Sequence, residues 1–336
     1  MTTLSFRRQV LVLSILIAVL AGAYILGLVF SPARVSKREA ETPLLPALKK
    51  ELVAKIALAS AEGSLELTRS GESWSIPVGD QTFPASESRI DTFFDFLEEL
   101  KRSRIVTDNP DSWTDFEVGT DAASRIQLLD ASGQALVDLI VGKSSAGGND
   151  NYVRLEGSNE VVLTNSAFHY YLNVQTRFWA HLLILPEELE GRDIMRISVR
   201  SDLEFPDGGP GELDYTLLLS DEHPGLWQVA GEPDTRLDSD AVDRLASDLA
   251  DLEGTDFAVA VSAKEAGLDE PSAQILISTL DDRDFRLLVG SLIGENQAYV
   301  AREEREYIYK VSEWRLKGIL KPITELVEQK QEQEQQ

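Results

Sequence analysis

Residues 52–325 carry the same series of sequence landmarks twice, and this internal repeat limits the folds open to the chain more than any other feature. Each copy starts with two short runs of alternating apolar and polar residues around a polar turn, which is the pattern of a β-hairpin. Trp74 marks the second run of the first hairpin, and Trp227, 153 positions later, marks the second run of the other. The repeat therefore predicts two units with the same order of strands and helices.

A helix is predicted after each hairpin. In both copies apolar residues recur at helical spacing, so that they form one stripe along a helix. Polar clusters at residues 86–88 and 238–240 contain serine and acidic side chains, which are typical of helix N-termini. The stripes consist of Ile90, Phe93, Phe94, Leu97 and Leu100 in the first copy and of Val242, Leu245, Leu249 and Leu252 in the second.

Two pairs of glycines supply the next landmarks. Gly119 and Gly267 each precede a strand-like run and are 148 positions apart, so we place them in register. Gly142 and Gly290 end apolar strand-like runs and are also 148 positions apart. The offset between the copies thus drifts only from 153 to 148 along the whole repeat, which is hard to obtain by chance.

Each copy closes with two strands around a short turn and a predicted helix, at residues 166–172 and 312–320. Antiparallel strands with one covering helix make each unit α+β. The charged cluster at residues 281–284 lies between two strand-like runs, so we interpret it as a hairpin turn rather than a cation site. The predicted organisation is a cytoplasmic N-terminus at 1–9, a transmembrane helix at 10–30, a linker at 31–51, repeats at 52–180 and 181–325, and a disordered polar tail at 326–336.

The uncharged apolar run from Val10 to Phe30 has 21 residues. As a helix that rises about 1.5 Å per residue it is roughly 30 Å long, the thickness of the hydrocarbon core of a bilayer. The small-residue motif at 21–23 offers a competing interpretation, the cleavage site of a signal peptide. Because the apolar run continues past that motif, the pattern favours an uncleaved transmembrane helix.

Charge is distributed unevenly along the chain, which has 57 acidic and 32 basic residues. All acidic residues lie from Glu39 onward, whereas five basic residues precede it, so the rest of the chain has a net charge of −30. Such a surface repels phosphates, and nucleic acid is not expected as a partner. The short basic N-terminus favours a cytoplasmic location for that end. We therefore expect a single-pass protein of the inner (cytoplasmic) membrane, with most of the chain periplasmic or otherwise extracytoplasmic.

The residue types that most often supply catalysis or metal binding are scarce. There are no cysteines, which excludes disulfides and thiolate zinc sites. The three histidines, at 169, 181 and 223, are not at the spacing of metal ligands, and the chain contains neither a P-loop nor a G-x-S-x-G motif. We accordingly predict no catalytic residue, no metal ligand and no cofactor.

The order of landmarks resembles the bacterial family called domain of unknown function 4340, which combines one N-terminal span with a Trp-ending hairpin and a helix. A Gly-Leu-x-x-Pro element, a Val-Gly strand end and a Tyr-Val strand follow in that family. The matching residues here are 267–271, 288–290 and 299–300, whereas residues 119–121 of the first copy lack the Leu and the Pro. The resemblance implies association with a membrane ABC transport system of the gliding-motility type, and no known activity.

Together these features predict a binding or scaffold protein, an accessory component of an ABC-type transport complex that also contacts the lipid bilayer through residues 10–30. Phe178 and Trp179 near the junction of the repeats, and Trp314 in the closing helix, are the candidate contacts with a partner. Two alternatives remain, a cell-envelope polymer hydrolase with a carboxylate pair and a polymer- or cation-binding envelope module. A deep cleft with convergent carboxylates favours the hydrolase, and shallow apolar surfaces favour binding.

Overall fold

The computed structural model describes Val19, residues 42–119 and residues 124–328, apart from positions 221, 222, 224, 233, 295 and 305. The chain divides into two compact units. The first consists of residues up to Ser73 and the stretch Glu87–Gln175, and the second consists of Trp74–Ser86 and the residues from Thr176 onward. The described chain is mostly β, with two antiparallel sheets and few helices.

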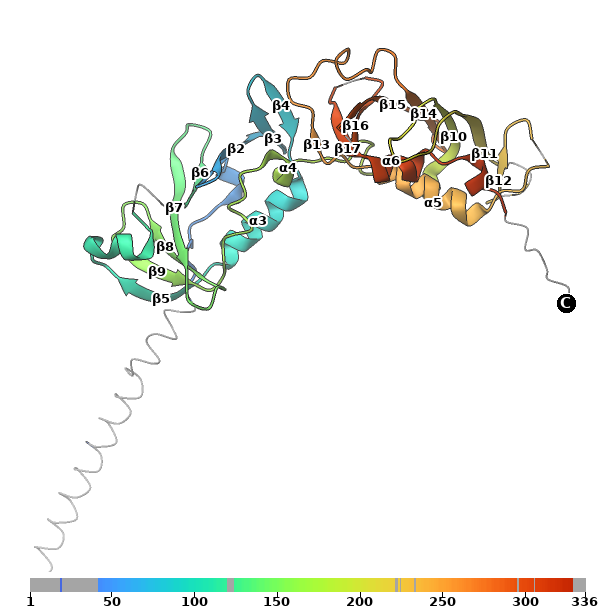
Figure 1. The fold of residues 1–336 in the computed structure, drawn as a ribbon. Coiled ribbons are helices and arrows are strands. Elements are labelled where there is room, and N and C mark those ends of the chain that lie inside the picture. Colours follow the sequence, from blue (N-terminus) through green and yellow to red (C-terminus); the bar gives the residue numbers. More distant parts are fainter. Residues whose placement is uncertain are drawn as a thin grey trace, which may run out of the picture. The chain divides into compact units, whose positions relative to one another are not determined.

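The first sheet has the strand order β4-β3-β2-β1-β6-β7-β8-β9-β5 (Figure 1). Sequence neighbours mostly lie side by side in it, as expected for hairpins joined by short turns. The pairs are antiparallel throughout the registers that are defined. The strands are β1 (Lys55–Ser60), β2 (Gly63–Ser70), β3 (Ser73–Val78), β4 (Gln81–Pro84), β5 (Arg102–Thr107), β6 (Ser124–Leu129), β7 (Ala135–Ser144), β8 (Asn151–Leu155) and β9 (Val161–Thr164).

The second sheet has the order β12-β11-β10-β14-β15-β16-β17-β13. With β4 set aside, each strand of the second sheet stands where its counterpart stands in the first, so the two copies have the same strand order. The strands are β10 (Ile194–Ser201), β11 (Leu213–Leu219), β12 (Trp227–Val229), β13 (Asp256–Phe257), β14 (Ala273–Thr279), β15 (Asp284–Ile293), β16 (Gln297–Arg302) and β17 (Tyr309–Ser312).

The equivalence extends to individual residue pairs in the two cores. Leu58 lies opposite Ile126 in the first sheet, and Val199 lies opposite Ile275 in the second. All four side chains are at most 1% exposed. Because alternate residues of a strand point to opposite faces, this register directs one apolar face of each sheet into its core.

The helices are α3 (Glu87–Glu99), α4 (Thr176–Trp179), α5 (Ser239–Ala250) and α6 (Glu313–Ile319), with short 3-10 helices η1 (Lys50–Leu52), η2 (Pro110–Phe116), η3 (Gly191–Asp193) and η4 (Ile323–Glu325). The apolar stripes predicted for α3 and α5 are buried. At the start of α5 the Asp238 carboxylate accepts a hydrogen bond from the Ala241 amide, which is the expected N-cap. The turn at residues 281–284 joins β14 to β15 as a hairpin, as predicted.

The helix predicted at residues 166–172 is absent, and the chain there forms turns. Two buried side chains explain the difference. Asn151 accepts a hydrogen bond from the Phe168 amide at 3.0 Å, and the Thr164 hydroxyl donates to the Ser166 carbonyl at 2.8 Å. The Thr164 bond occupies the Ser166 carbonyl, which would accept the Tyr170 amide in a helix, and the Asn151 bond ties the Phe168 amide to the sheet. Side chain–backbone pairing therefore competes with the helical pattern.

Both ends of the repeat region are more ordered than the sequence suggests. In the predicted linker, Leu44 is 2% exposed and its amide donates to the Leu100 carbonyl at 2.7 Å. In the predicted tail, Leu326 is fully buried and the Glu328 amide donates to the Arg236 carbonyl. Single apolar residues within these polar stretches thus pack against the folded units. Of the predicted tail, only residues 329–336 lie outside the described residues.

The predicted transmembrane helix from Val10 to Phe30 lies, except for Val19, outside the described residues. Within the part of the chain that is described, none of the helices has the length and the apolar character needed to cross a bilayer.

Candidate functional site

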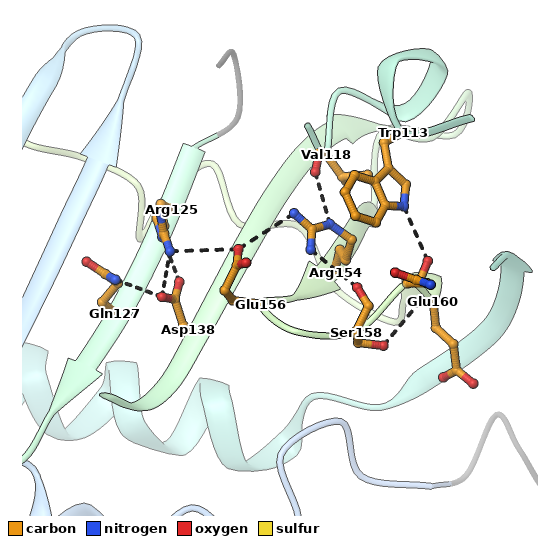
Figure 2. A network of polar contacts seen from close by, with 10 residues as sticks. Trp113, Val118, Arg125, Gln127, Asp138, Arg154, Glu156, Ser158 and Glu160 are labelled. Atoms are coloured by element: carbon orange, nitrogen blue, oxygen red, sulfur yellow. Dashed lines mark hydrogen bonds and ion pairs between the residues drawn. The ribbon is translucent and has the colours of Figure 1, made fainter. Parts of the chain in front are cut away.

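A row of charged side chains lies on one face of the first sheet, across β6, β7 and β8 (Figure 2). Gln127 stands opposite Asp138, and Arg125 and Arg154 both stand opposite Ile140 from the two sides of β7. Residues that stand opposite each other on neighbouring strands point to the same face of the sheet, and so does every second residue along one strand. All of these side chains therefore share one face.

Arg125 and Asp138 form the best-defined ion pair of this row. The guanidinium donates two hydrogen bonds of 2.6 Å to the two carboxylate oxygens, and Gln127 donates a third of 2.8 Å to Asp138. The bond with Asp138 raises the pKa of the Arg125 guanidinium above its ordinary value. Arg125 also lies 3.8 Å from Glu156, which links the pair to the rest of the row.

Arg154 is a buried cation, with a side chain only 2% exposed. Its Nε donates to the Val118 carbonyl at 3.2 Å and its Nη1 to the Ser158 carbonyl at 3.3 Å. The guanidinium carbon lies 3.9 Å from the centre of the Trp113 ring, a cation–π contact. Glu156 lies 3.7 Å from Nη2 and supplies the compensating charge.

The second copy has small residues where the first has Arg154 and Trp113. Ala301 on β16 takes the register position of Arg154, and Ala263 takes that of Trp113. Ala301 is fully buried in an apolar cluster, so the corresponding part of the second sheet is packed by apolar side chains and contains no buried charge among the described residues. The stacked Arg–Trp pair is therefore a feature of the first copy, where it fastens the η2 segment to the sheet. The sequence offered no signal for it, because the two residues are 41 positions apart and match no motif.

Replacing Arg154 with alanine is expected to lower the free energy of unfolding by about 2–4 kcal/mol, since two charge-assisted hydrogen bonds and the contact with Trp113 are lost together. Arg200→Ala is the matched control, because the Arg200 side chain is 77% exposed in its ion pair with Asp214. Its effect should stay within about 0.5 kcal/mol. Denaturant unfolding measures both, and equal effects of the two substitutions would contradict a fastening role for Arg154.

The two hairpin tryptophans lie on counterpart strands and are buried. Trp74 on β3 is 5% exposed and Trp227 on β12 is 6% exposed. The Trp227 indole also donates a hydrogen bond of 2.8 Å to the Asp243 carboxylate on α5. Both side chains thus serve as packing anchors of their hairpins, the role that their recurrence suggests.

The three candidate partner contacts differ in exposure. Trp179 is fully buried, so the predicted patch of Phe178 and Trp179 does not exist as an exposed surface. Phe178 is half-buried and its ring packs edge-on against Trp179, with centroids 5.1 Å apart. Trp314, in contrast, is 71% exposed. Two neighbouring aromatic residues near a repeat junction can belong to a hydrophobic core as readily as to a partner interface. Here Trp179 belongs to the core.

Hydrogen bonds change one predicted equivalence between the glycine landmarks. The Glu117 amide donates to the Thr114 carbonyl at 3.2 Å, and the Gly267 amide donates to the Lys264 carbonyl at 3.1 Å. Both donors have left-handed backbones, with φ of +58° and +72°. Glu117, rather than Gly119, therefore takes the place of Gly267, because one copy uses glycine in the left-handed turn and the other accepts the strain of a side chain.

Gly142 and Gly290 do occupy matching sites. A β carbon on Gly142 would lie 2.1 Å from the Phe116 carbonyl oxygen, and one on Gly290 would lie 2.0 Å from the Ala266 carbonyl oxygen. Neither site leaves room for a side chain, so the close approach of two backbones requires glycine in both copies.

The histidines and acidic clusters do not assemble a metal centre among the residues that the structure describes, where no group of three His, Asp or Glu side chains has a suitable arrangement. His169 and His223 are exposed, and His181 is half-buried. Burial raises the pKa of Tyr309 to about 12 and that of Tyr215 further, so both phenols stay protonated at neutral pH. The Tyr215 hydroxyl donates to the Lys321 carbonyl at 2.7 Å, which is a packing role.

Comparisons with known proteins bear on the family alone. An uncharacterized protein of Treponema pallidum (strain Nichols) is 23% identical over 120 residues, which cover 36% of this chain and 38% of that protein. No solved structure matches the chain significantly. The family model described as Domain of unknown function (DUF4340) matches residues 74–214 and again residues 227–333, and the two matches start at the two hairpin tryptophans. With more than half of its residues matched, the chain belongs to the Domain of unknown function (DUF4340) family.

Proposed function

We propose that this protein is a membrane-anchored binding protein, with its two sheets on the extracytoplasmic side of the inner membrane and an ABC-type transport complex as its partner. The apolar run at residues 10–30 supplies the anchor, and the family resemblance supplies the class of partner. The observation that carries the proposal is the exposed Trp314 on α6, the surface feature best suited to hold a protein partner.

Trp314 differs from an ordinary surface residue in size and in exposure. Its side chain is 71% exposed, whereas its helix neighbours Leu316 and Ile319 are at most 1% exposed. The helix is therefore anchored on the core by one face and presents the indole on the other. Tryptophan is the residue type most enriched among the energetic anchors of protein interfaces, because it buries a large area at a low cost in conformational entropy.

Polar contacts hold α6 in place around this indole. Arg315 donates to the Asp251 carbonyl and to the Glu253 carboxylate, each at 3.3 Å, and its guanidinium carbon lies 5.3 Å from the Trp314 ring centre. Lys317 pairs with Asp207, and this hydrogen bond raises the pKa of the Lys317 amine. A helix held at several points offers a preformed contact, so little ordering cost remains to be met on binding.

Tethering strengthens the proposal physically. A protein held beside a bilayer meets a membrane partner at a high effective concentration, which makes a small interface sufficient. The net charge of −30 on residues from Glu39 onward disfavours adsorption of the sheets to anionic lipid headgroups. We infer that the contact is made with protein rather than with the lipid surface.

Trp314→Glu is the direct test. Loss of an interface anchor costs about 2 kcal/mol or more, which is roughly a thirtyfold loss of affinity. The amount of transport-complex subunits that co-purify with the full-length protein from detergent-solubilised membranes should therefore fall at least about tenfold. Leu280→Glu is the matched control, since Leu280 is 60% exposed in the β14–β15 turn, and it should leave recovery unchanged.

Undiminished recovery with Trp314→Glu would reject α6 as the contact. Turnover of a cell-envelope polymer by the purified protein, abolished by replacing one carboxylate, would instead favour the hydrolase alternative. Binding of such a polymer without turnover would favour an envelope-binding module.

A further inference from the structure

The edge of the second sheet at β12 lacks a strand that the same edge of the first sheet has. β3 and β12 are counterparts, since each is the outer strand of its Trp-containing hairpin. β4 pairs with β3 in antiparallel register, from Ser75 opposite Pro84 to Val78 opposite Gln81. In the second sheet β12 is the last strand, and among the described residues only an isolated bridge between Val229 and Glu232 stands in the place of β4.

One residue of β12, Trp227, points its backbone groups outward beside no further strand of the described chain, whereas the Val229 carbonyl accepts the Glu232 amide at 3.1 Å. On the inner side of β12 the Ser220 amide donates to the Leu226 carbonyl, and the Ala230 amide donates to the Thr216 carbonyl, both at 2.8 Å. Hydrogen-bonded and non-hydrogen-bonded pairs alternate along an antiparallel ladder. Trp227, which lies between these bonds, therefore directs its amide and carbonyl away from β11.

The first copy shows what such outward groups bind. There the Ala85 amide, at the end of β4, donates to the Trp74 carbonyl at 3.0 Å. Leu237 is the counterpart of Ala85, because each stands two residues before the first residue of its helix. No bond between Leu237 and Trp227 closes the second copy within the described residues, and both side chains line an open groove instead.

This groove has a volume of 580 Å³ and combines apolar and acidic surface. Leu226 on its wall is 51% exposed. Asp238, Asp240 and Glu328 line it against the single cation of Arg236 among its described lining residues. An unpaired strand edge with a net negative rim is complementary to an extended chain of positive charge.

We propose that an extended segment of a partner protein, carrying basic side chains, adds to β12 in this groove as an antiparallel strand, in the way that β4 adds to β3. The partner's backbone supplies hydrogen bonds to the outward amide and carbonyl of Trp227. Its apolar side chains contact Leu226, and its basic side chains face the acidic rim. None of the lining residues belongs to α6, so this surface is additional to the Trp314 contact.

Fluorescent peptides that contain β4 test the proposal with full-length protein in neutral-detergent micelles. Residues 79–86 are preceded by two lysines in the probe and by two glutamates in the matched peptide. At low salt the lysine peptide should bind at least about tenfold more tightly than the glutamate peptide, and the difference should shrink at about 0.5 M salt. Amide hydrogen exchange at Trp227 should slow when the lysine peptide is bound.

A pair of surface variants locates the binding. Leu226→Lys places a positive charge in the groove without disturbing the core, and it should weaken the lysine peptide at least about fivefold. Leu280→Lys makes the same change at a residue that is 60% exposed outside the groove, and it should leave the affinity unchanged. Equal effects of the two variants would overturn the assignment of the groove.

Three further results would also overturn the proposal. The first is equal affinity for both peptides together with unchanged exchange at Trp227. The second is protection of the Trp227 amide in the protein alone that disappears when residues 329–336 are removed, because the occupant is then the chain's own tail. The third is protection that rises with protein concentration alongside dimer formation, because the occupant is then a second copy.

Discussion

Replacing Trp179 with alanine is expected to lower the free energy of unfolding of the second unit by about 3–5 kcal/mol. Trp179 heads the largest fully buried side chains and is 0% exposed at the end of α4. Its backbone carbonyl accepts a hydrogen bond of 2.7 Å from the Ser86 amide. Removal of the indole leaves a cavity between segments that are distant in sequence, and rigid surroundings of this kind collapse only in part.

The second copy has a smaller side chain at the position that corresponds to Trp179. Leu326 is the counterpart of Trp179, since its carbonyl accepts the Asp238 amide at 2.9 Å and its side chain is also 0% exposed. Trp179→Leu should therefore cost less than the alanine variant, about 1–2 kcal/mol.

Trp314→Ala is the matched control, because it makes the same substitution at an exposed position. Its indole is 71% exposed, so its removal should change the free energy of unfolding by no more than about 0.5 kcal/mol. Denaturant unfolding followed by near-UV circular dichroism provides the comparison. A loss below about 1 kcal/mol for Trp179→Ala would show that this site relaxes or is not part of a packed core.

Gly290→Ala is the second substitution with a large expected effect, about 3 kcal/mol or more, from overpacking against backbone. The new β carbon would lie 2.0 Å from the Ala266 carbonyl oxygen, which already accepts the Ser291 amide at 2.8 Å. Relief of the clash requires a shift of backbone, because no flexible side chain is available to move. Gly142→Ala should have a similar effect, because its β carbon would lie 2.1 Å from the Phe116 carbonyl oxygen.

Gly119→Ala tests whether a glycine landmark matters when there is room for a side chain. No atom lies within 4 Å of a β carbon placed there. Its effect should stay within about 0.5 kcal/mol, even though the sequence pattern gives Gly119 the same standing as Gly142. Thermal unfolding of the three variants is sufficient, and a large loss with Gly119→Ala would restore the equivalence of Gly119 and Gly267.

The sequence predicts best those elements whose apolar residues recur at a single regular spacing, because that spacing alone determines the secondary structure. The stripes of α3 and α5 repeat at helical spacing over about three turns, and the N-cap at Asp238 follows from local chemistry. The strand order in the second copy could be transferred from the first because the two hairpin tryptophans fixed the alignment.

The predictions that differ from the structure depend on contacts between distant residues. The helix pattern at residues 166–172 loses to hydrogen bonds with Asn151 and Thr164. Trp179 is core rather than interface because Ser86 and the β3–β4 hairpin return to it from about 90 positions earlier in the chain. The contact of Arg154 with Trp113 has no sequence signature at all, since it depends on how η2 lies over β8.

The candidate partner surface was only partly accessible to sequence reasoning, for the same reason. All three aromatic residues, Phe178, Trp179 and Trp314, looked alike in the sequence. Exposure alone separates them, and exposure is set by what packs on each helix from elsewhere in the fold.

Photo-crosslinking from position 314 in intact membranes shows whether α6 contacts a transport complex. A photoreactive amino acid placed at Trp314 in the full-length protein should yield an adduct with a subunit of an ABC-type transport complex, because the exposed indole of α6 is the proposed contact. The same residue placed at Leu280, which is 60% exposed, should give no such adduct. Absence of a membrane-protein adduct from position 314, or the same adducts from both positions, would reject α6 as the contact with the partner.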